Sequence, residues 1–333
     1  MSCCLGIEST ADDFSVGILS FDGEVLANVT STYISESGGI HPREAAQHHA
    51  KNVGIVLREA FREAGMRPGD IAVVAFSQGP GMGPCLRTGA TAARALASYL
   101  DVPLVGVNHL IAHIEIGKLT TGAKDPVTLF VSGGNTLVSA FDAGRYRIFG
   151  ETLDIAIGNC IDVFAREAGL RPKERMPVAA MVEALASRGR ILIPLPYTVK
   201  GMDLSFSGLL TAATDLLHEG RHPLEDLCYS LQEGVFSMLT EVTERALAHT
   251  EKTEVLLTGG VAANARLQSM LKIIAEEHEA RFCVVSKQFA MDNGAMIAWT
   301  GILAYQHGLK VPIEKSYIKL KWRVNDVDVP WMD

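Results

Sequence analysis

The hydrophobic pattern divides the chain into two similar series of short strands and helices. Apolar runs at residues 3–7, 14–19 and 24–30 are separated by polar turns, which predicts a three-stranded meander. The same order of apolar runs and turns returns at residues 127–131, 137–140 and 146–151. This repetition predicts a duplicated domain.

Helical and strand patterns alternate after each meander. In the first half, helical spacing at 44–65 and 87–99 alternates with apolar strands at 71–76 and 104–107. In the second half, helices are predicted at 224–249 and 264–279, and strands at 254–258 and 281–285. Such alternation is typical of mixed sheets covered by helices. The predicted architecture is therefore two α/β lobes with a ligand cleft between them.

Composition and charge narrow the class of protein. The chain has 333 residues, of which 48% are hydrophobic and 20% charged, and this excludes intrinsic disorder. Its formal net charge of −8 argues against binding nucleic acid by bulk charge alone. The six cysteines form no CxxC pair, so we expect buried reduced thiols. No signal peptide and no membrane span are predicted, and the expected compartment is the cytoplasm.

A His-x-x-x-His pair is the first candidate for chemistry. It follows the predicted strand 104–107, and Asn108 is a suitable N-cap for a helix that begins there. His109 and His113 share one helical face at a separation that suits two ligands of one metal ion. Because such pairs are often purely structural, a third ligand is needed, and Asp292 after the strand 281–285 is the best candidate. Phe130, at the end of a strand, offers no ligand atom.

A zinc protease would need a glutamate directly after the first histidine as its general base. This chain has Leu110 at that position, and the nearest acid, Glu115, lies beyond the second histidine. We therefore expect a metal at this pair to act as a Lewis acid or template rather than as an activator of hydrolytic water.

Two glycine pairs predict a nucleotide site. Gly133-Gly134 and Gly259-Gly260 each follow an apolar strand, where backbone N–H groups can approach phosphate oxygens or a base. One such pair is a common turn, but two in a two-lobed α/β chain favour a nucleotide cleft. Asp162 is placed where a helix begins, and it either accepts a hydrogen bond from a ribose or substrate ammonium or complements the helix dipole.

Nine segments spread over essentially the whole chain match one family in family order. They are residues 6–10, 39–44, 79–83, 108–113, 131–136, 152–159, 200–208, 258–264 and 292–294. With these segments the chain resembles the tRNA threonylcarbamoyladenosine transferases, the TsaD/Kae proteins once described as O-sialoglycoprotein endopeptidases, in their archaeal and eukaryotic branch.

The resemblance implies a fold and a reaction. The fold is a duplicated actin-like, sugar-kinase-like (ASKHA) α/β fold, with lobes at residues 1–125 and 126–333 and a C-terminal segment that packs back on the first lobe. The reaction is transfer of the threonylcarbamoyl group from threonylcarbamoyl-AMP to N6 of adenosine 37 in tRNAs that read ANN codons, with release of AMP.

The resemblance also implies ligands and partners. A single Fe²⁺ or Zn²⁺ ion would be bound by His109, His113 and Asp292. The adenine nucleotide, threonylcarbamoyl-AMP or ATP, would contact two groups of residues: Phe130, Val131, Ser132, Gly133 and Gly134 on the phosphate and metal side, and Asp162, Glu183 and Asn264 elsewhere. No further catalytic side chain is assigned. The implied partners are tRNA and the subunits of a KEOPS-type assembly, which are a small atypical kinase, fused in some archaeal relatives, and small accessory proteins.

The chain departs from the family pattern at two places. Archaeal relatives carry a tyrosine where Phe130 stands, and its phenolic oxygen completes the metal shell, so this site would have one protein ligand fewer. The family's Pro-Gly-Gly-Pro is replaced by Pro177, Val178 and Ala179, after an insertion that contains Arg171, Lys173 and Arg175. Glu183 stays in register.

Two other functions are compatible with the sequence. One is a metal-dependent glycoprotein endopeptidase, which Leu110 disfavours, and the other is a non-catalytic nucleotide-binding scaffold. If the chain modifies tRNA, its acidic charge predicts weak RNA binding by the isolated protein. The basic stretches 315–323 and 171–175 would contribute, and partner proteins would supply much of the phosphate contact.

Overall fold

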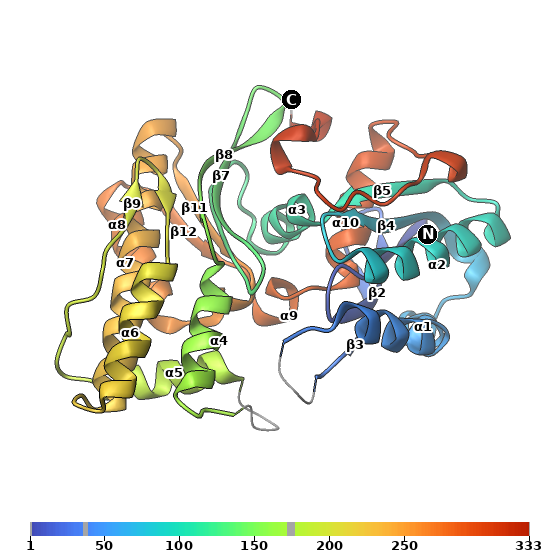
Figure 1. Cartoon of the computed structure of the whole chain (residues 1–333). Coiled ribbons are helices and arrows are strands. Elements are labelled where there is room, and N and C mark those ends of the chain that lie inside the picture. Colours follow the sequence, from blue (N-terminus) through green and yellow to red (C-terminus); the bar gives the residue numbers. More distant parts are fainter. Residues whose placement is uncertain (1, 36–38, 172–176, 333) are drawn as a thin grey trace. The chain divides into compact units, whose positions relative to one another are not determined.

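A computed structural model describes residues 2–35, 39–171 and 177–332, and these form two compact units (Figure 1). The first unit comprises Met1–Gly122, Asp142–Tyr146 and Met291–Asp333, and the second comprises Ala123–Phe141 and Arg147–Ala290. The sequence predicted lobes at residues 1–125 and 126–333, with a C-terminal segment that packs back on the first lobe. In the structure the segment Met291–Asp333 and the hairpin tip Asp142–Tyr146 group with the first unit, so both units are discontinuous.

The sheet of the first unit begins with the predicted meander. Strands β1 (Cys3–Glu8), β2 (Asp13–Ser20) and β3 (Val25–Thr32) pair in antiparallel order. Strands β4 (Ile71–Gly79) and β5 (Leu104–Asn108) extend the sheet parallel to β1, which gives the order β3-β2-β1-β4-β5. Because β1, β4 and β5 run in the same direction, their carboxyl ends lie at one edge.

Helices cover the sheet of the first unit. The predicted helices α1 (Pro42–Ala64) and α2 (Gly83–Leu100) pack on the side chains of Leu5 and Ile7. Helix α10 (Gly294–Gln306) packs on the opposite face, where a Cβ on Gly6 would lie 2.2 Å from the backbone nitrogen of Ala298. A side chain at position 6 would therefore push α10 away from the sheet. Helix α3 (His109–Thr121) follows β5 directly and packs beside α10.

The sheet of the second unit repeats this order. Strands β6 (Val127–Val131), β7 (Thr136–Asp142) and β8 (Arg145–Glu151) form the second predicted meander. Strands β11 (Glu254–Thr258) and β12 (Arg281–Val284) continue parallel to β6. The order β8-β7-β6-β11-β12 matches that of the first unit strand for strand, which confirms the duplication predicted from the sequence.

The helices of the second unit bury a large apolar core against this sheet. Helix α7 (Leu224–Thr250) is the longest of the helices in the described residues and confirms the prediction for 224–249. The remaining elements are α4 (Ile157–Glu167), α5 (Val178–Ala186), α6 (Ser207–Glu219), α8 (Ala265–Glu277), the short helix α9 (Lys287–Ala290), the hairpin β9 (Val199–Lys200) and β10 (Asp203–Leu204), and the 3₁₀ turn η2 (Gly260–Ala263).

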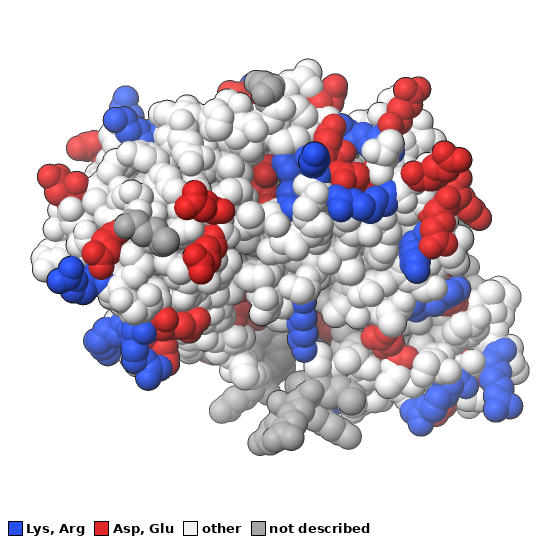
Figure 2. Space-filling model, turned by 180° about the vertical axis from the view of Figure 1, so that it is seen from behind, with Lys and Arg blue, Asp and Glu red and all other residues white. Residues whose placement is uncertain are grey.

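The surface carries the charge of the chain in small groups. On the face shown in Figure 2, acidic and basic side chains of the described residues are interspersed, and neither sign dominates. Among residues 2–35, 39–171 and 177–332, no helix is both long enough and apolar enough to cross a bilayer.

Candidate functional site

The histidine pair is positioned by the junction between β5 and α3. The Asn108 side chain caps α3, because its Oδ1 accepts hydrogen bonds from the backbone nitrogens of Leu110 (3.0 Å) and Ile111 (3.2 Å). The N-cap predicted from the sequence is therefore confirmed. His109 becomes the first residue of the helix and His113 follows one turn later on the same face.

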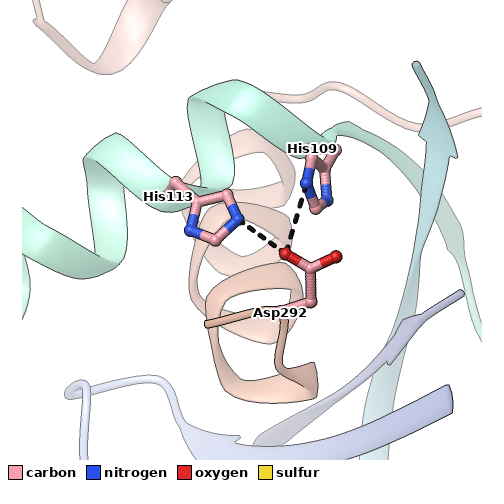
Figure 3. Close-up of side chains that lie close together, drawn as sticks. All are labelled: His109, His113 and Asp292. Atoms are coloured by element: carbon pink, nitrogen blue, oxygen red, sulfur yellow. Dashed lines mark hydrogen bonds and ion pairs between the residues drawn. The ribbon is translucent and has the colours of Figure 1, made fainter. Parts of the chain in front are cut away.

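Asp292 meets both histidines from the segment that leads into α10 (Figure 3). Its Oδ1 lies 3.1 Å from Nε2 of His113 and 3.6 Å from Nε2 of His109. One ligand atom of each residue lies within 4.8 Å of the other two. All three belong to the first unit, so the structure brings together the three residues that the sequence assigned to a metal ion.

Two further residues, Glu8 and Thr10, hold this cluster in place, and sequence reasoning gave them no role. Glu8 ends β1 and is fully buried, with Oε2 3.1 Å from Nδ1 of His109. Its Oε1 accepts a hydrogen bond from the backbone nitrogen of Thr10 at 2.6 Å. The Thr10 hydroxyl donates to Oδ2 of Asp292 at 3.3 Å. The signal that could have found Glu8 is its place directly after an apolar strand at the sheet edge where Asn108 and His109 begin.

Electrostatics couple the members of the cluster. Burial by itself lowers the pKa of His109, but Asp292 and Glu8 together raise that pKa to about 9. Burial opposes the ionisation of Asp292, yet the neighbouring His109 and the hydrogen bond from His113 keep its pKa below the usual range. Burial lowers the pKa of His113. At neutral pH the ion-free cluster is therefore a charged His109–Asp292 pair beside a neutral His113.

The donor set fits a divalent transition-metal ion. Two imidazole nitrogens and one carboxylate oxygen suit Zn²⁺ or Fe²⁺. Glu8 engages Nδ1 of His109 and directs Nε2 toward Asp292, which is the carboxylate–histidine arrangement common behind metal ligands. These residues could therefore hold such an ion in the first unit.

The structure also shows the surroundings of Leu110, where a zinc protease would have its glutamate, and of Phe130, where archaeal relatives have a tyrosine. Leu110 is buried and offers no base beside His109. Glu115 instead accepts a hydrogen bond from the Tyr146 hydroxyl at 2.6 Å and pairs with Lys118. Phe130 lies buried in β6 and belongs to the second unit.

The second unit carries both glycine turns. Ser132 Oγ accepts hydrogen bonds from the backbone nitrogens of Asn135 (3.0 Å) and Gly134 (3.3 Å), which closes the turn after Val131. Gly133 and Gly134 are exposed, and apart from the adjoining residues of the chain nothing lies within 4 Å of the position a Cβ would take at either residue. Their backbone is therefore open to a ligand from one side.

The two turns adjoin each other because β6 and β11 are parallel neighbours. Gly259 has a φ of 97°, and a Cβ there would lie 2.3 Å from the carbonyl oxygen of Val131. Gly158, at the start of α4, packs as closely, since its Cβ would lie 2.7 Å from the carbonyl oxygen of Ser132. Glycine at these two positions is what allows the turns and α4 to meet.

Asn264 and Glu183 meet at the N-terminus of α8. Asn264 caps the helix through Oδ1, which accepts from Arg266 N at 2.9 Å, and its Nδ2 donates to Gln232 Oε1 at 3.0 Å. Glu183, on α5, accepts a hydrogen bond from the backbone nitrogen of Ala265 at 2.7 Å. The sequence predicted a helix that begins at Asn264, and in the structure Asn264 is the N-cap of that helix.

The predicted position of Asp162 in its helix is wrong. The residue lies within α4, which begins at Ile157, so it does not occupy a first turn where it would complement the helix dipole. Its side chain is exposed. Val178 and Ala179 form the first turn of α5, and Lys173 and Arg175 lie outside the described residues.

Sequence comparisons identify close relatives. The sequence model described as tRNA N6-adenosine threonylcarbamoyltransferase matches residues 24–299. A Thermofilum pendens protein named tRNA N6-adenosine threonylcarbamoyltransferase is 55% identical over 98% of this chain and 96% of its own length. A Methanothermobacter thermautotrophicus protein named probable bifunctional tRNA threonylcarbamoyladenosine biosynthesis protein is 56% identical over 99% of this chain, which spans only 61% of that longer protein.

Structural comparisons establish the fold. HypF from T. kodakarensis superposes with a TM-score of 0.65 over 92% of this chain and 48% of its own, at 15% identity. A ROK-family glucokinase from Streptomyces griseus superposes with a TM-score of 0.51 over 91% of this chain and 99% of its own, at 11% identity. The predicted duplicated, actin-like and sugar-kinase-like α/β fold is thereby confirmed.

Proposed function

The chain belongs to the tRNA N6-adenosine threonylcarbamoyltransferase family, and on that premise we propose that it transfers threonylcarbamoyl from threonylcarbamoyl-AMP to N6 of adenosine 37 in tRNAs that read ANN codons. In this step N6 of the adenine attacks the carbamoyl carbonyl carbon and forms a new C–N bond. The bond between that carbon and the phosphate oxygen of AMP breaks, AMP departs with the electron pair, and N6 loses one proton.

The observation that carries the proposal is the cluster of His109, His113 and Asp292 with Glu8 behind it. His109, His113 and Asp292 would hold a divalent cation, Fe²⁺ or Zn²⁺, which would supply a Lewis acid for the carbonyl and phosphate oxygens. Glu8 engages Nδ1 of His109 and leaves Nε2 as the ligand atom, and Thr10 engages one oxygen of Asp292. The chain's own residues thus hold the three ligands in a single arrangement before substrate arrives.

The proposed nucleotide site lies in the second unit. The open backbone of Gly133 and Gly134 suits a phosphate, and the N-terminus of α8, which follows the second glycine turn, adds the positive end of a helix dipole. Asn264 and Glu183, both at that N-terminus, are proposed to contact the nucleoside, with Asp162 as a further contact. The attacking adenine must leave its stack in the anticodon loop to reach the carbonyl.

The proposed partners follow from the family and from the charge of the chain. We expect the protein to work in a KEOPS-type assembly with a small kinase and small accessory subunits. The bifunctional name of a relative that is longer than this chain agrees with such an additional activity. An acidic chain that acts on tRNA also gains from partners that supply phosphate contacts.

The decisive experiment is incubation of the full chain with threonylcarbamoyl-AMP and tRNA, with and without the partner subunits, followed by nucleoside analysis. Threonylcarbamoyladenosine should appear with the wild type and fall sharply with His113→Ala. His218→Ala, a change to an exposed histidine in the second unit, is the matched control and should retain activity. Metal-dependent cleavage of a glycoprotein without any modified adenosine would overturn the proposal. Full modification by His109→Ala in the assay reconstituted with the partner subunits would favour a non-catalytic nucleotide-binding scaffold over a metal-dependent transferase.

A further inference from the structure

Residues 315–323 form a basic strip on an acidic protein. These nine residues include Lys315, Lys319, Lys321 and Arg323 and no acidic residue, whereas the whole chain has a net charge of −8. Lys315 is the last residue of the 3₁₀ turn η3 (Ile313–Lys315), and residues 316–323 continue without helix or strand to the 3₁₀ turn η4 (Val324–Asp326). In Figure 1 it belongs to the red C-terminal part of the ribbon in the first unit.

The backbone of the strip is fixed to the sheet of the first unit. Gln78, near the end of β4, donates to the carbonyl of Tyr317 at 2.7 Å and accepts from the nitrogen of Lys319 at 2.7 Å. Arg94 on α2 donates to the hydroxyl of Ser316 at 2.7 Å and also to its carbonyl oxygen. The strip is therefore an ordered surface whose polar backbone groups are already used.

The exposed side chains of the strip combine positive charge with large apolar groups. Tyr317 is 69% exposed and Leu320 is 52% exposed, while Ile318 packs on the core. The ammonium of Lys319 lies 3.8 Å from the centre of the Trp322 ring. Lys315, Lys319 and Lys321 are exposed, and none of them forms an ion pair within the described part of the chain. Their positive charge is available to a ligand.

One residue connects this strip to the metal-ligand cluster. Asn108 donates from Nδ2 to the carbonyl of Trp322 at 3.0 Å, and its Oδ1 caps the helix that begins with His109. The strip and the cluster therefore lie at the same edge of the sheet in the same unit. The Trp322 end of the strip therefore adjoins the β5–α3 junction that carries His109.

We infer that the 315–323 strip is the surface on which this chain binds the anticodon loop of tRNA, with the lysines at phosphates and Tyr317 stacked on an unpaired base. The inference rests on the proposed function. Single-stranded RNA is recognised by exposed aromatic rings together with Lys and Arg that follow the backbone, which is the composition found here. An acidic protein partner is the alternative occupant, and the test below distinguishes it from RNA.

The test measures RNA binding separately from chemistry. The probe is a fluorescently labelled anticodon stem-loop RNA, titrated with the full chain at several salt concentrations. The first variant replaces the three strip lysines (K315S, K319S and K321S together), and the matched control replaces exposed lysines elsewhere (K51S, K200S and K272S together), so that both lower the net charge by the same amount. A third variant, Tyr317→Ala, removes the ring without changing charge.

We expect the strip variant to lose at least about tenfold in affinity and to lower the salt slope by about 2, because three phosphate contacts at roughly 0.7 each are removed. The control variant should bind within about twofold of wild type. Tyr317→Ala should lose about fivefold or more with an unchanged salt slope, as expected for stacking. Equal binding by the strip and control variants would overturn the inference, as would loss of binding to partner proteins with RNA affinity intact.

A second readout separates this inference from the proposed function. In the modification assay, the strip variant should raise the KM for tRNA while kcat at saturating tRNA stays within about twofold of wild type. If wild-type protein with its partners forms no modified adenosine, the proposed function fails, yet the stem-loop titration still decides whether the strip binds RNA. If modification occurs and the strip variant has an unchanged KM and affinity, only the strip inference fails.

Discussion

Glu8 and His109 form a buried ion pair, with Oε2 of the carboxylate 3.1 Å from Nδ1 of the imidazole. The pair joins the last residue of β1 to the first residue of α3, and it determines which ring nitrogen of His109 faces Asp292. The carboxylate therefore acts on the metal ligands without being one of them.

Replacement of Glu8 by glutamine should weaken metal binding at the cluster by at least about tenfold. The amide keeps an oxygen for the Thr10 nitrogen but turns its NH₂ group toward Nδ1 of His109, which places the proton on Nε2 and blocks that nitrogen as a ligand. Zinc affinity measured by competition with a chelator tests this, and the exposed Glu24→Gln is the matched control. A Glu8→Gln protein that competes like the control would show that the carboxylate does not set the tautomer.

Asp13 should make the stability of the ion-free protein pH-dependent. Burial raises the pKa of this carboxyl to about 7, against the hydrogen bond from Thr32 and with added repulsion from Asp292, Asp12 and Glu8. The pKa of Asp13 is higher in the folded protein than in the unfolded chain, so the protonated carboxyl stabilises the fold relative to the ionised one. This contribution to the free energy of unfolding is fully present below about pH 4 and is lost as pH rises through 7. Asp13→Asn removes this dependence.

The Asp13→Asn variant should therefore gain stability over wild type between pH 5 and pH 8, up to a limit of about 4 kcal/mol set by 1.4 kcal/mol for each unit of pKa shift. Urea unfolding of both proteins at each pH, without metal, gives the difference in free energy of unfolding. The exposed Asp22→Asn serves as control and should show no trend. A constant difference between Asp13→Asn and wild type across this range would mean that Asp13 ionises normally in the folded protein.

The sequence predicted strongly patterned elements and local caps, but it missed side chains brought in by long-range packing. Both meanders and the cap by Asn108 depend on neighbouring residues, and these predictions are confirmed. Glu8 joins His109 only because β1 and β5 share a sheet with β4 between them. The hydrophobic pattern of one segment does not show which strands become its neighbours in the sheet, or in which register they pair.

Helix α10 shows a second limit of sequence patterning. It is buried on most sides, so its sequence lacks the single apolar stripe of a surface helix, and the helix was not predicted.

Asp162 shows a third limit, because the start of α4 is not set by a side-chain cap. In that case a helix boundary predicted from residue type alone is off by more than a turn.

Gly158→Ala should weaken AMP binding in the second unit, if the glycine turns hold phosphate as proposed. The added Cβ would lie 2.7 Å from the carbonyl oxygen of Ser132 and 2.8 Å from the nitrogen of Gly133, so α4 and the turn must separate. We expect at least about a tenfold loss in AMP affinity by calorimetry. Gly208→Ala is closely matched, because Gly208 is likewise the second residue of its helix and nothing lies within 4 Å of its Cβ position.

The control variant should bind AMP like wild type and gain up to about 1 kcal/mol in stability from the better helix propensity of alanine. Equal AMP affinity in both glycine variants would place the phosphate away from the Ser132–Gly134 turn.

Asn264 allows the cap of α8 to be separated from ligand binding. In Asn264→Asp the carboxylate still accepts from the nitrogens of Arg266 and Leu267, so the cap is retained and the stability should change by less than about 0.5 kcal/mol. The amide of Gln232 can turn to donate to the new oxygen. The added negative charge, however, lies at the helix N-terminus and repels a phosphate.

AMP affinity of Asn264→Asp should therefore fall at least about tenfold while its urea midpoint stays near that of wild type. Asn264→Ala should lose AMP affinity and about 1 kcal/mol of stability together, because it removes the cap as well. The two variants thus distinguish a ligand contact from a structural cap, since only a ligand contact makes the Asp variant defective. An Asn264→Asp protein with wild-type AMP affinity and normal modification activity would assign Asn264 to the helix cap alone, and the nucleotide would have to bind elsewhere in the second unit.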